Sequence, residues 1–213
     1  MKTYWKIIGL ALVAYSFVAG MLVEVPDLPV VRQSIRMVFY HVPMWFAMIA
    51  MLATSFFYSI RVLENKKTYQ DMHALSAAKT AILFGLIGLI SGMLWAQYAW
   101  GRWWINDPKL NGAALSLFML FAYLILRNSV SDITRKTKVA AVYNIFAFVM
   151  SILFLLVYPR MGGQSIHPAS GTESMMGSIV SLDNTMRLVF YPAVLGWIII
   201  AFWVRRAFLK KSL

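Results

Sequence analysis

Residues Thr80–Trp100 read TAILFGLIGLISGMLWAQYAW, an apolar segment of 21 residues without a charged side chain. The hydrocarbon core of a bilayer is about 30 Å thick, and a helix crosses it with roughly 20 apolar residues. Five further charge-poor segments of similar length occur in the chain: Trp5–Val23, Val38–Ile60, Leu110–Leu126, Val139–Tyr158 and Leu188–Val204. The sequence therefore predicts an all-α membrane protein, a bundle of about six transmembrane helices.

The composition leaves no room for a separate soluble domain. Of the 213 residues, 61% are hydrophobic and 13% are charged, whereas soluble domains are nearer half apolar and a quarter charged. Six spans with short connections account for the whole length, so residues 1–213 are expected to form a single integral membrane domain. The chain has no cysteine, which excludes disulfides, thiolate metal sites and covalent haem attachment through a Cys-x-x-Cys-His motif in this chain.

The charged residues between the spans predict the orientation. With the N-terminus inside, 14 of the 20 Lys and Arg residues lie at inner connections and 6 at outer ones. Cytoplasmic loops are enriched in Lys and Arg, so both termini are expected in the cytoplasm, and the first span is expected to be retained rather than cleaved as a signal peptide. Three loops then face outward, at about 24–37, 101–109 and 159–187. The net charge of +12 is interpreted as a topology signal and a contact with anionic membrane lipid, not as a nucleic-acid surface.

Two of the three histidines lie at the predicted outer face. His41 belongs to the segment FYHVPMW at 39–45. Because proline is tolerated in the first turn of a helix, Pro43 suggests that His41 lies near the start of the second span. His167 lies in the third outer loop, in GGQSIHP at 162–168. Each alone is consistent with an ordinary interfacial or loop histidine, but two imidazoles on separate segments are the minimum that holds a porphyrin iron from both faces.

The inner connections offer less chemistry. Arg61–Lys79 and Arg127–Lys138 are interpreted as short basic connectors. His73, beside Asp71 in the first of them, is interpreted as a solvated surface histidine.

Residues 95–110 concentrate aromatic side chains at the predicted outer face. They read WAQYAWGRWWINDPKL and contain half of the chain's eight tryptophans. Trp and Tyr are enriched at membrane interfaces in general, but an interfacial belt distributes them over all helix ends. We therefore expect these residues to form a loop with a flat apolar surface for a large planar ligand. Haem meets each requirement, because it has an apolar ring, an iron that takes imidazole and two propionates for arginine. The outward candidates for the propionates, among which the sequence does not choose, are Arg32, Arg36, Arg102 and Arg187.

Residues 100–110, WGRWWINDPKL, resemble the tryptophan-rich WWD signature of haem-handling membrane proteins. With HVPMW at 41–45, HP at 167–168 and six spans in a short chain, the sequence is similar to the heme exporter protein C (CcmC) family of the cytochrome c maturation system over nearly its whole length. The resemblance implies that haem b is bound non-covalently, with His41 and His167 as axial iron ligands. The haem contacts that it implies, or that lie in the same segment, are Trp95, Trp100, Trp103, Trp104 and Asp107.

The resemblance also implies a function at the periplasmic face of the bacterial inner membrane. The protein is expected to present haem for covalent loading onto the haem chaperone CcmE, beside the small helper CcmD and the ATP-binding-cassette subunits CcmA and CcmB. It is expected to be a haem-transfer protein rather than an enzyme, with His167, on a glycine-rich loop, as the more mobile ligand. Two positions depart from the family pattern: Asn106 stands where members often have a further tryptophan, and 160–164 where many have a tryptophan pair.

Two other classes of function remain open. A membrane b-type cytochrome that carries electrons would place its haem ligands near the middle of two helices. A permease subunit for haem or another solute would line its path with intramembrane polar residues. Neither His41 nor His167 lies near the centre of a predicted span, and the six apolar segments contain no acidic residue, so both alternatives rank below haem presentation.

Overall fold

A computed structural model describes residues 2–26, 31–65, 68–161, 165, 167 and 182–212. Within these residues the chain is helical and has no strand, and six helices are long and apolar enough to cross a membrane, which confirms the predicted fold class of a multi-pass membrane protein. The long helices are α1 (Thr3–Leu22), α2 (Val38–Asn65), α3 (Thr68–Trp100), α4 (Pro108–Ser129), α5 (Ile133–Ile152) and α8 (Asn184–Ser212). A 3-10 helix, η1 (Arg32–Met37), leads into α2, and a π-helical turn, η2 (Leu153–Val157), continues α5 into α6 (Tyr158–Met161).

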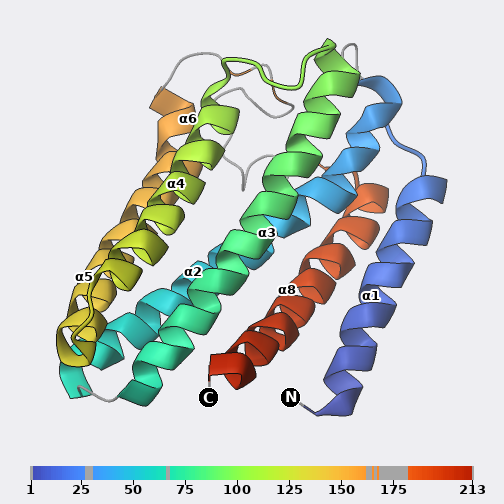
Figure 1. The fold of residues 1–213 in the computed structure, drawn as a ribbon. Coiled ribbons are helices and arrows are strands. Elements are labelled where there is room, and N and C mark those ends of the chain that lie inside the picture. Colours follow the sequence, from blue (N-terminus) through green and yellow to red (C-terminus); the bar gives the residue numbers. More distant parts are fainter. Residues whose placement is uncertain are drawn as a thin grey trace.

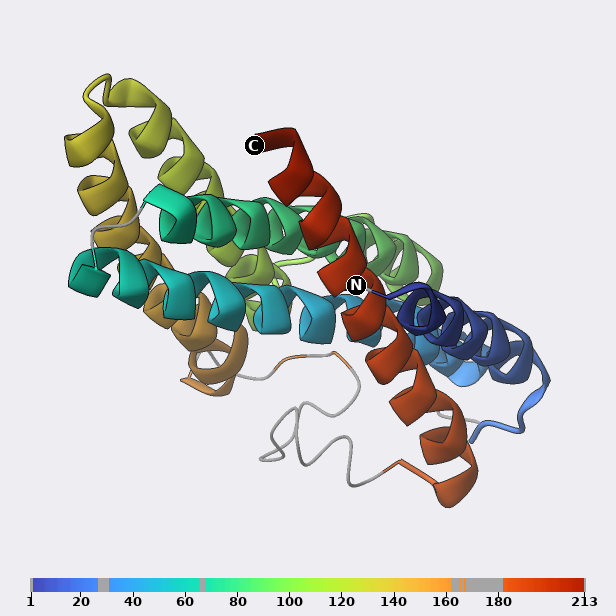
Figure 2. The ribbon, with the colours of Figure 1, turned by 90° about the horizontal axis from the view of Figure 1, so that it is seen from below.

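Helices α2 and α3 form the centre of the bundle. The α4–α5 pair lies on one side of them and the α1–α8 pair on the other (Figures 1 and 2). Both termini lie at one end, here called the terminal end, and the α3–α4 connection lies at the opposite end, here called the loop end (Figure 1). The charge pattern predicts that the terminal end is cytoplasmic.

Glycines on α3 let α2 approach closely. The facing pairs are Gly92 with His41, Gly88 with Trp45 and Gly85 with Met48. A Cβ atom on any of these glycines would lie only 2.8–2.9 Å from the facing side chain, and small residues of this kind are typical of tightly packed membrane helices. Because the three contacts follow one another along both helices, they fix the register of α2 against α3, and with it the position of His41.

The inner connector predicted at Arg61–Lys79 is wrong. Helix α2 continues to Asn65 and α3 begins at Thr68, and polar residues in the first turns of α3 are held by tertiary contacts. Asp71 is buried and accepts two hydrogen bonds from the guanidinium group of Arg127 on α4, one of them Nη1 to Oδ1 at 2.6 Å. The pair joins α3 to α4 at the terminal end. Likewise, helix covers most of the predicted connector Arg127–Lys138, because α4 continues to Ser129 and α5 begins at Ile133.

The interpretation of His73 as a solvated histidine is also wrong. Its side chain is buried, with the residue 8% exposed, and its ring stacks on Tyr58 with centroids 4.7 Å apart. Arg205 of α8 places Nη2 2.6 Å from His73 Nδ1. A histidine near the end of an apolar span can thus be covered by a neighbouring helix that the local sequence does not reveal.

Candidate functional site

His41 is the fourth residue of α2, at the loop end. The expectation that Pro43 stands in the first turn of this helix is wrong, because α2 begins at Val38 and η1 extends helical backbone further upstream. Proline is therefore inside the helix, where it lacks an N–H for the ladder. His41 is half-buried against α3, where Gly92 faces its ring.

Both ring nitrogens of His41 have partners. Ser91 donates its hydroxyl proton to the carbonyl oxygen of Gly88 (3.0 Å), and its Oγ lies 3.0 Å from His41 Nδ1. The Nε1–H group of Trp45 donates to His41 Nε2 at 3.2 Å. Since the hydroxyl of Ser91 already donates its proton to Gly88, its oxygen accepts from Nδ1–H of His41, and Nε2 of His41 carries the lone pair. This network assigns His41 as a neutral imidazole protonated on Nδ1.

Trp95 belongs to α3 and not to a loop. It is 5% exposed, its Nε1–H donates to Ser34 Oγ at 3.0 Å, and its ring meets that of His41 edge-on with centroids 5.9 Å apart. Helix α3 continues to Trp100 and stops at Gly101, whose φ of +72° is the left-handed conformation that glycine adopts most easily. The predicted loop 95–110 is therefore mostly helix, and only 101–107 connects α3 to α4.

Asp107 organises the other half of the site. Its carboxylate caps α4 by accepting from the backbone N–H of Lys109 at 2.8 Å, as expected for an Asp before a helix that begins with proline. Ser165 Oγ donates to both carboxylate oxygens, at 2.8 and 3.1 Å. His167 Nδ1 lies 3.1 Å from Asp107 Oδ1. The His167 ring also contacts Trp100, with centroids 5.0 Å apart, so one buried carboxylate ties the third outer segment to α3 and α4.

The environment of Asp107 favours its charged form. Burial by itself raises the pKa of this carboxyl, but the contacts from His167, the hydroxyl of Ser165 and the backbone N–H of Lys109 outweigh burial. Together they hold the pKa of Asp107 well below its usual range. At neutral pH a negatively charged carboxylate therefore lies 3.1 Å from Nδ1 of His167.

The two histidines lie at the same end of the bundle, each beside a tryptophan of α3. Trp95 contacts His41 and Trp100 contacts His167, and these tryptophans are five residues apart on α3, roughly 7.5 Å along the helix axis. In each histidine Nδ1 faces an oxygen, from Ser91 or from Asp107. Nε2 is the remaining ring nitrogen in both.

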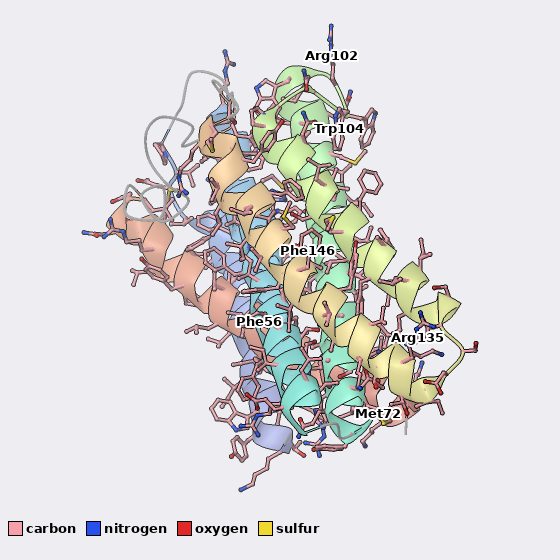
Figure 3. The ribbon with its side chains drawn as sticks, turned by 90° about the vertical axis from the view of Figure 1, so that its left-hand side faces the viewer. Phe56, Met72, Arg102, Trp104, Arg135 and Phe146 are labelled. Carbon is pink, nitrogen blue, oxygen red and sulfur yellow. The ribbon has the colours of Figure 1, made fainter. Side chains whose placement is uncertain are left out.

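The predicted arginine contacts differ in what they do. Arg36 Nη1 donates to the carbonyl oxygens of Gly20 (2.9 Å) and Val23 (2.5 Å) at the end of α1. Its guanidinium group thus caps a helix C-terminus. Arg102 is exposed and extends from the loop end (Figure 3), and Arg187, at the start of α8, lies 3.5 Å from Asn184 Oδ1. Arg32, the fourth candidate, is exposed with a φ of 42°.

Trp103 and Trp104 are 54% and 40% exposed, and Figure 3 places Trp104 at the loop end near Arg102. They lie in the connection between α3 and α4, not in the buried network around the histidines. Of the four tryptophans in the predicted platform, Trp95 and Trp100 contact a histidine, and Trp103 and Trp104 form exposed apolar surface beside it.

Three residues of the site were missed in the sequence: Trp45, Ser91 and Ser165. Trp45 had a usable signal, because it stands four residues after His41 and residues at this spacing lie on one face of a helix. Ser91 and Ser165 had none, because the pairing of α2 with α3 and of 165 with α4 brings together residues 50 and 58 positions apart.

Comparison with known proteins assigns the family. Residues 3–166 match the family described as cytochrome C assembly protein. Heme exporter protein C of Paracoccus denitrificans is 27% identical over 127 residues, 56% of this chain and 50% of the relative; that of Bradyrhizobium diazoefficiens is 26% identical over 153 residues, 71% and 56%. Cytochrome c biogenesis protein CcsA of Pelargonium hortorum is 33% identical over 109 residues, 51% and 32%. The chain thus spans about half the length of the heme exporter relatives, and the resemblance to them is confirmed. With a match over most of its length, the chain belongs to the cytochrome c assembly protein family.

Proposed function

We propose that this protein binds haem b non-covalently between His41 and His167, at the loop end of the bundle, and presents it for transfer during c-type cytochrome biogenesis. The observation that carries the proposal is the matched setting of the two imidazoles. A histidine that binds a metal usually donates its other ring N–H to an oxygen that orients the ring. Ser91 Oγ lies 3.0 Å from Nδ1 of His41, and Asp107 Oδ1 lies 3.1 Å from Nδ1 of His167. Nε2 of each ring would then bind the iron, once Trp45 has released Nε2 of His41.

Haem suits these residues better than a bare metal ion does. Bound haem would supply an iron that needs only two further ligands, together with two propionates. Protein zinc sites, in contrast, take three or four side-chain ligands, and within the residues that the structure describes no three His, Asp or Glu side chains come together. Two orienting oxygens and two histidines are the donor set of an axially ligated porphyrin.

The surroundings are suited to a planar amphipathic ligand. Trp95 and Trp100 pack next to the two histidines, and Trp103 and Trp104 add exposed aromatic surface at the same end. Arg102 and Arg187 are the candidates for charge-assisted hydrogen bonds to propionates.

The orientation and partners belong to the same proposal. The terminal end faces the cytoplasm and the loop end the periplasm of a bacterial inner membrane, as the excess of Lys and Arg at the terminal end suggests. The relatives are named heme exporter protein C, and on that likeness haem passes to the chaperone CcmE in a complex with CcmD, CcmA and CcmB. The protein acts as a haem-transfer protein and not as an enzyme. His167 is the ligand that releases, because it lies on a segment outside the helices while His41 is inside α2.

Titration of the purified protein with haem tests the binding step. His41→Ala and His167→Ala should each raise the Kd for haem at least tenfold. His73→Gln is the matched control, since His73 is the third histidine and lies at the terminal end; its Kd should stay within twofold of wild type. Equal weakening by His73→Gln, or none by the other two, would contradict the proposal.

Covalent haem on CcmE in cells tests the transfer step. His41→Ala and His167→Ala should both abolish it. If the protein binds haem through both histidines but CcmE is still loaded with haem in cells that lack the protein, the protein is instead a b-type cytochrome.

A further inference from the structure

A cavity of about 710 Å³ opens at the terminal end, away from the histidine site. Its lining residues come from the start of α1, the start of α3 and the second half of α8. Figure 2 shows these three helices from below. Its lining includes Trp5, Ile199, Phe202, Arg205, Arg206 and Lys210. It combines an apolar interior with a basic rim.

The rim is positively charged and uncompensated. Arg205, Arg206 and Lys210 all come from α8, and none of the described residues that line the cavity is acidic. Arg206 and Lys210 are exposed and stand four residues apart, so they lie on one face of the helix. Among the residues that the structure describes, none of the three forms an ion pair with a carboxylate. Three cations without a counter-charge favour an anionic ligand.

Arg205 is held in place by its neighbours. Its Nη2 contacts His73 Nδ1 at 2.6 Å, and its guanidinium carbon lies 5.1 Å from the centre of the Tyr58 ring. Two polar atoms here, Nε of Arg205 and Nε2 of His73, are buried without a hydrogen-bond partner, and His73 itself is more than nine-tenths buried. Buried polar groups in proteins are nearly always paired, so this side of the cavity lacks an acceptor.

The apolar part continues along α8 in the direction of the bilayer core. Phe202 stands one turn and Ile199 two turns before Arg206, and Trp5 of α1 faces the same cavity. A free inorganic anion would leave this apolar surface uncovered, whereas an acyl chain would bury it. The ligand that fits is both anionic and lipidic.

We propose that this cavity is a binding site for one anionic phospholipid of the leaflet at the terminal end. Its phosphate accepts hydrogen bonds from Arg205, Arg206 and Lys210, and one acyl chain lies against Phe202 and Ile199. Cations that only reached the headgroup region would carry the same charge but would need no cavity beside them. The cavity therefore distinguishes a bound lipid from a diffuse contact with the membrane surface. The site is independent of haem binding at the loop end.

Native mass spectrometry of the detergent-purified chain, titrated with phosphatidylglycerol or phosphatidylcholine, tests the proposal. One phosphatidylglycerol should bind at least tenfold more tightly than phosphatidylcholine. Arg206→Gln/Lys210→Gln should abolish this preference. The matched control is Arg135→Gln/Lys138→Gln, which removes two exposed cations at the terminal end of α5; Figure 3 shows Arg135 there. The control should retain the preference within twofold.

Equal loss of preference in the control would overturn the proposal, because the attraction would then be diffuse. If inorganic phosphate competes with the lipid, the site binds a free anion and the proposal is overturned. If haem displaces the lipid from wild type and does not bind Arg206→Gln/Lys210→Gln, the site binds haem and the proposal is likewise overturned. Because Arg206 and Lys210 are exposed, their replacement leaves the fold intact, as an unchanged unfolding temperature would verify.

Discussion

The indole N–H of Trp45 donates a 3.2 Å hydrogen bond to Nε2 of His41, the ring nitrogen that the proposed iron bond needs. Nδ1 of the same ring is held by Ser91, so the imidazole cannot offer its other nitrogen. Trp45 must therefore turn away before His41 binds iron, and it competes with haem for the lone pair.

Trp45→Phe should tighten haem binding about fivefold, because a neutral hydrogen bond contributes about 1 kcal/mol and the variant keeps an aromatic ring in place. The Kd from a titration followed at the Soret band measures this. Trp197→Phe is the control, since Trp197 packs on Phe84 within the core and should not change affinity. Unchanged or weaker binding in Trp45→Phe would mean that the indole does not compete.

Ser91→Ala should weaken haem binding by about 10- to 100-fold, the usual effect of removing an oxygen that orients a metal-bound histidine. Without Ser91, the Nδ1 proton of His41 loses its acceptor and the ring can rotate. Ser76→Ala is the matched control: Ser76 is on the same helix and, like Ser91, donates to the carbonyl oxygen three residues earlier. If both variants bind haem as wild type does, Ser91 has no role in positioning His41.

Asp107→Asn should lower the free energy of unfolding by about 1 kcal/mol at neutral pH, because a charged acceptor becomes a neutral one, while asparagine still caps α4. The pKa of Asp107 is lower in the folded protein than in the unfolded chain. Its charge therefore stabilises the fold above the unfolded pKa of 3.8, and that contribution is lost as the pH falls through the folded pKa.

Thermal unfolding of wild type and Asp107→Asn across pH measures this difference. The advantage of wild type should be present above about pH 4 and absent in strong acid. An advantage that persisted or grew at the lowest pH would show that the carboxylate of Asp107 does not carry it.

Gly92→Ala should raise the Kd for haem in addition to lowering the unfolding temperature. A Cβ at Gly92 would lie 2.8 Å from Cε1 of His41 and would push the imidazole from its place. Gly85→Ala is equally crowded, with a Cβ 2.8 Å from Met48 Sδ, but it is further from the site. Both should lower the unfolding temperature, and Gly92→Ala alone should raise the Kd for haem. Equal Kd values for the two variants would contradict the role of this contact in positioning His41.

Apolar length made the spans predictable from sequence. The segment Thr80–Trp100 has no charge to interrupt it, and the structure contains it within α3. The true helix ends were not predictable, because Asp71 and His73 look like loop residues until α4 supplies Arg127 and α8 supplies Arg205. Local hydropathy cannot anticipate a partner from a distant helix.

The types of residue in the candidate site were predictable from the sequence, but their hydrogen-bond and packing partners were not. His41, His167 and Asp107 stand out because histidines are few and an aspartate follows a run of tryptophans. Their partners depend on the register between helices, which three glycines of α3 set. Arg36 looked equivalent to Arg102 in the sequence, and only the position of the end of α1 distinguishes a helix cap from an exposed cation.

The most direct test of the central claim is the electron paramagnetic resonance spectrum of the ferric haem complex. Ligation by His41 and His167 predicts a low-spin signal with two imidazoles in wild type. His41→Ala and His167→Ala should each become high-spin and return to low-spin when free imidazole is added. A wild-type complex that is high-spin, or a low-spin signal that survives both substitutions together, would contradict the claim that these two histidines hold one iron.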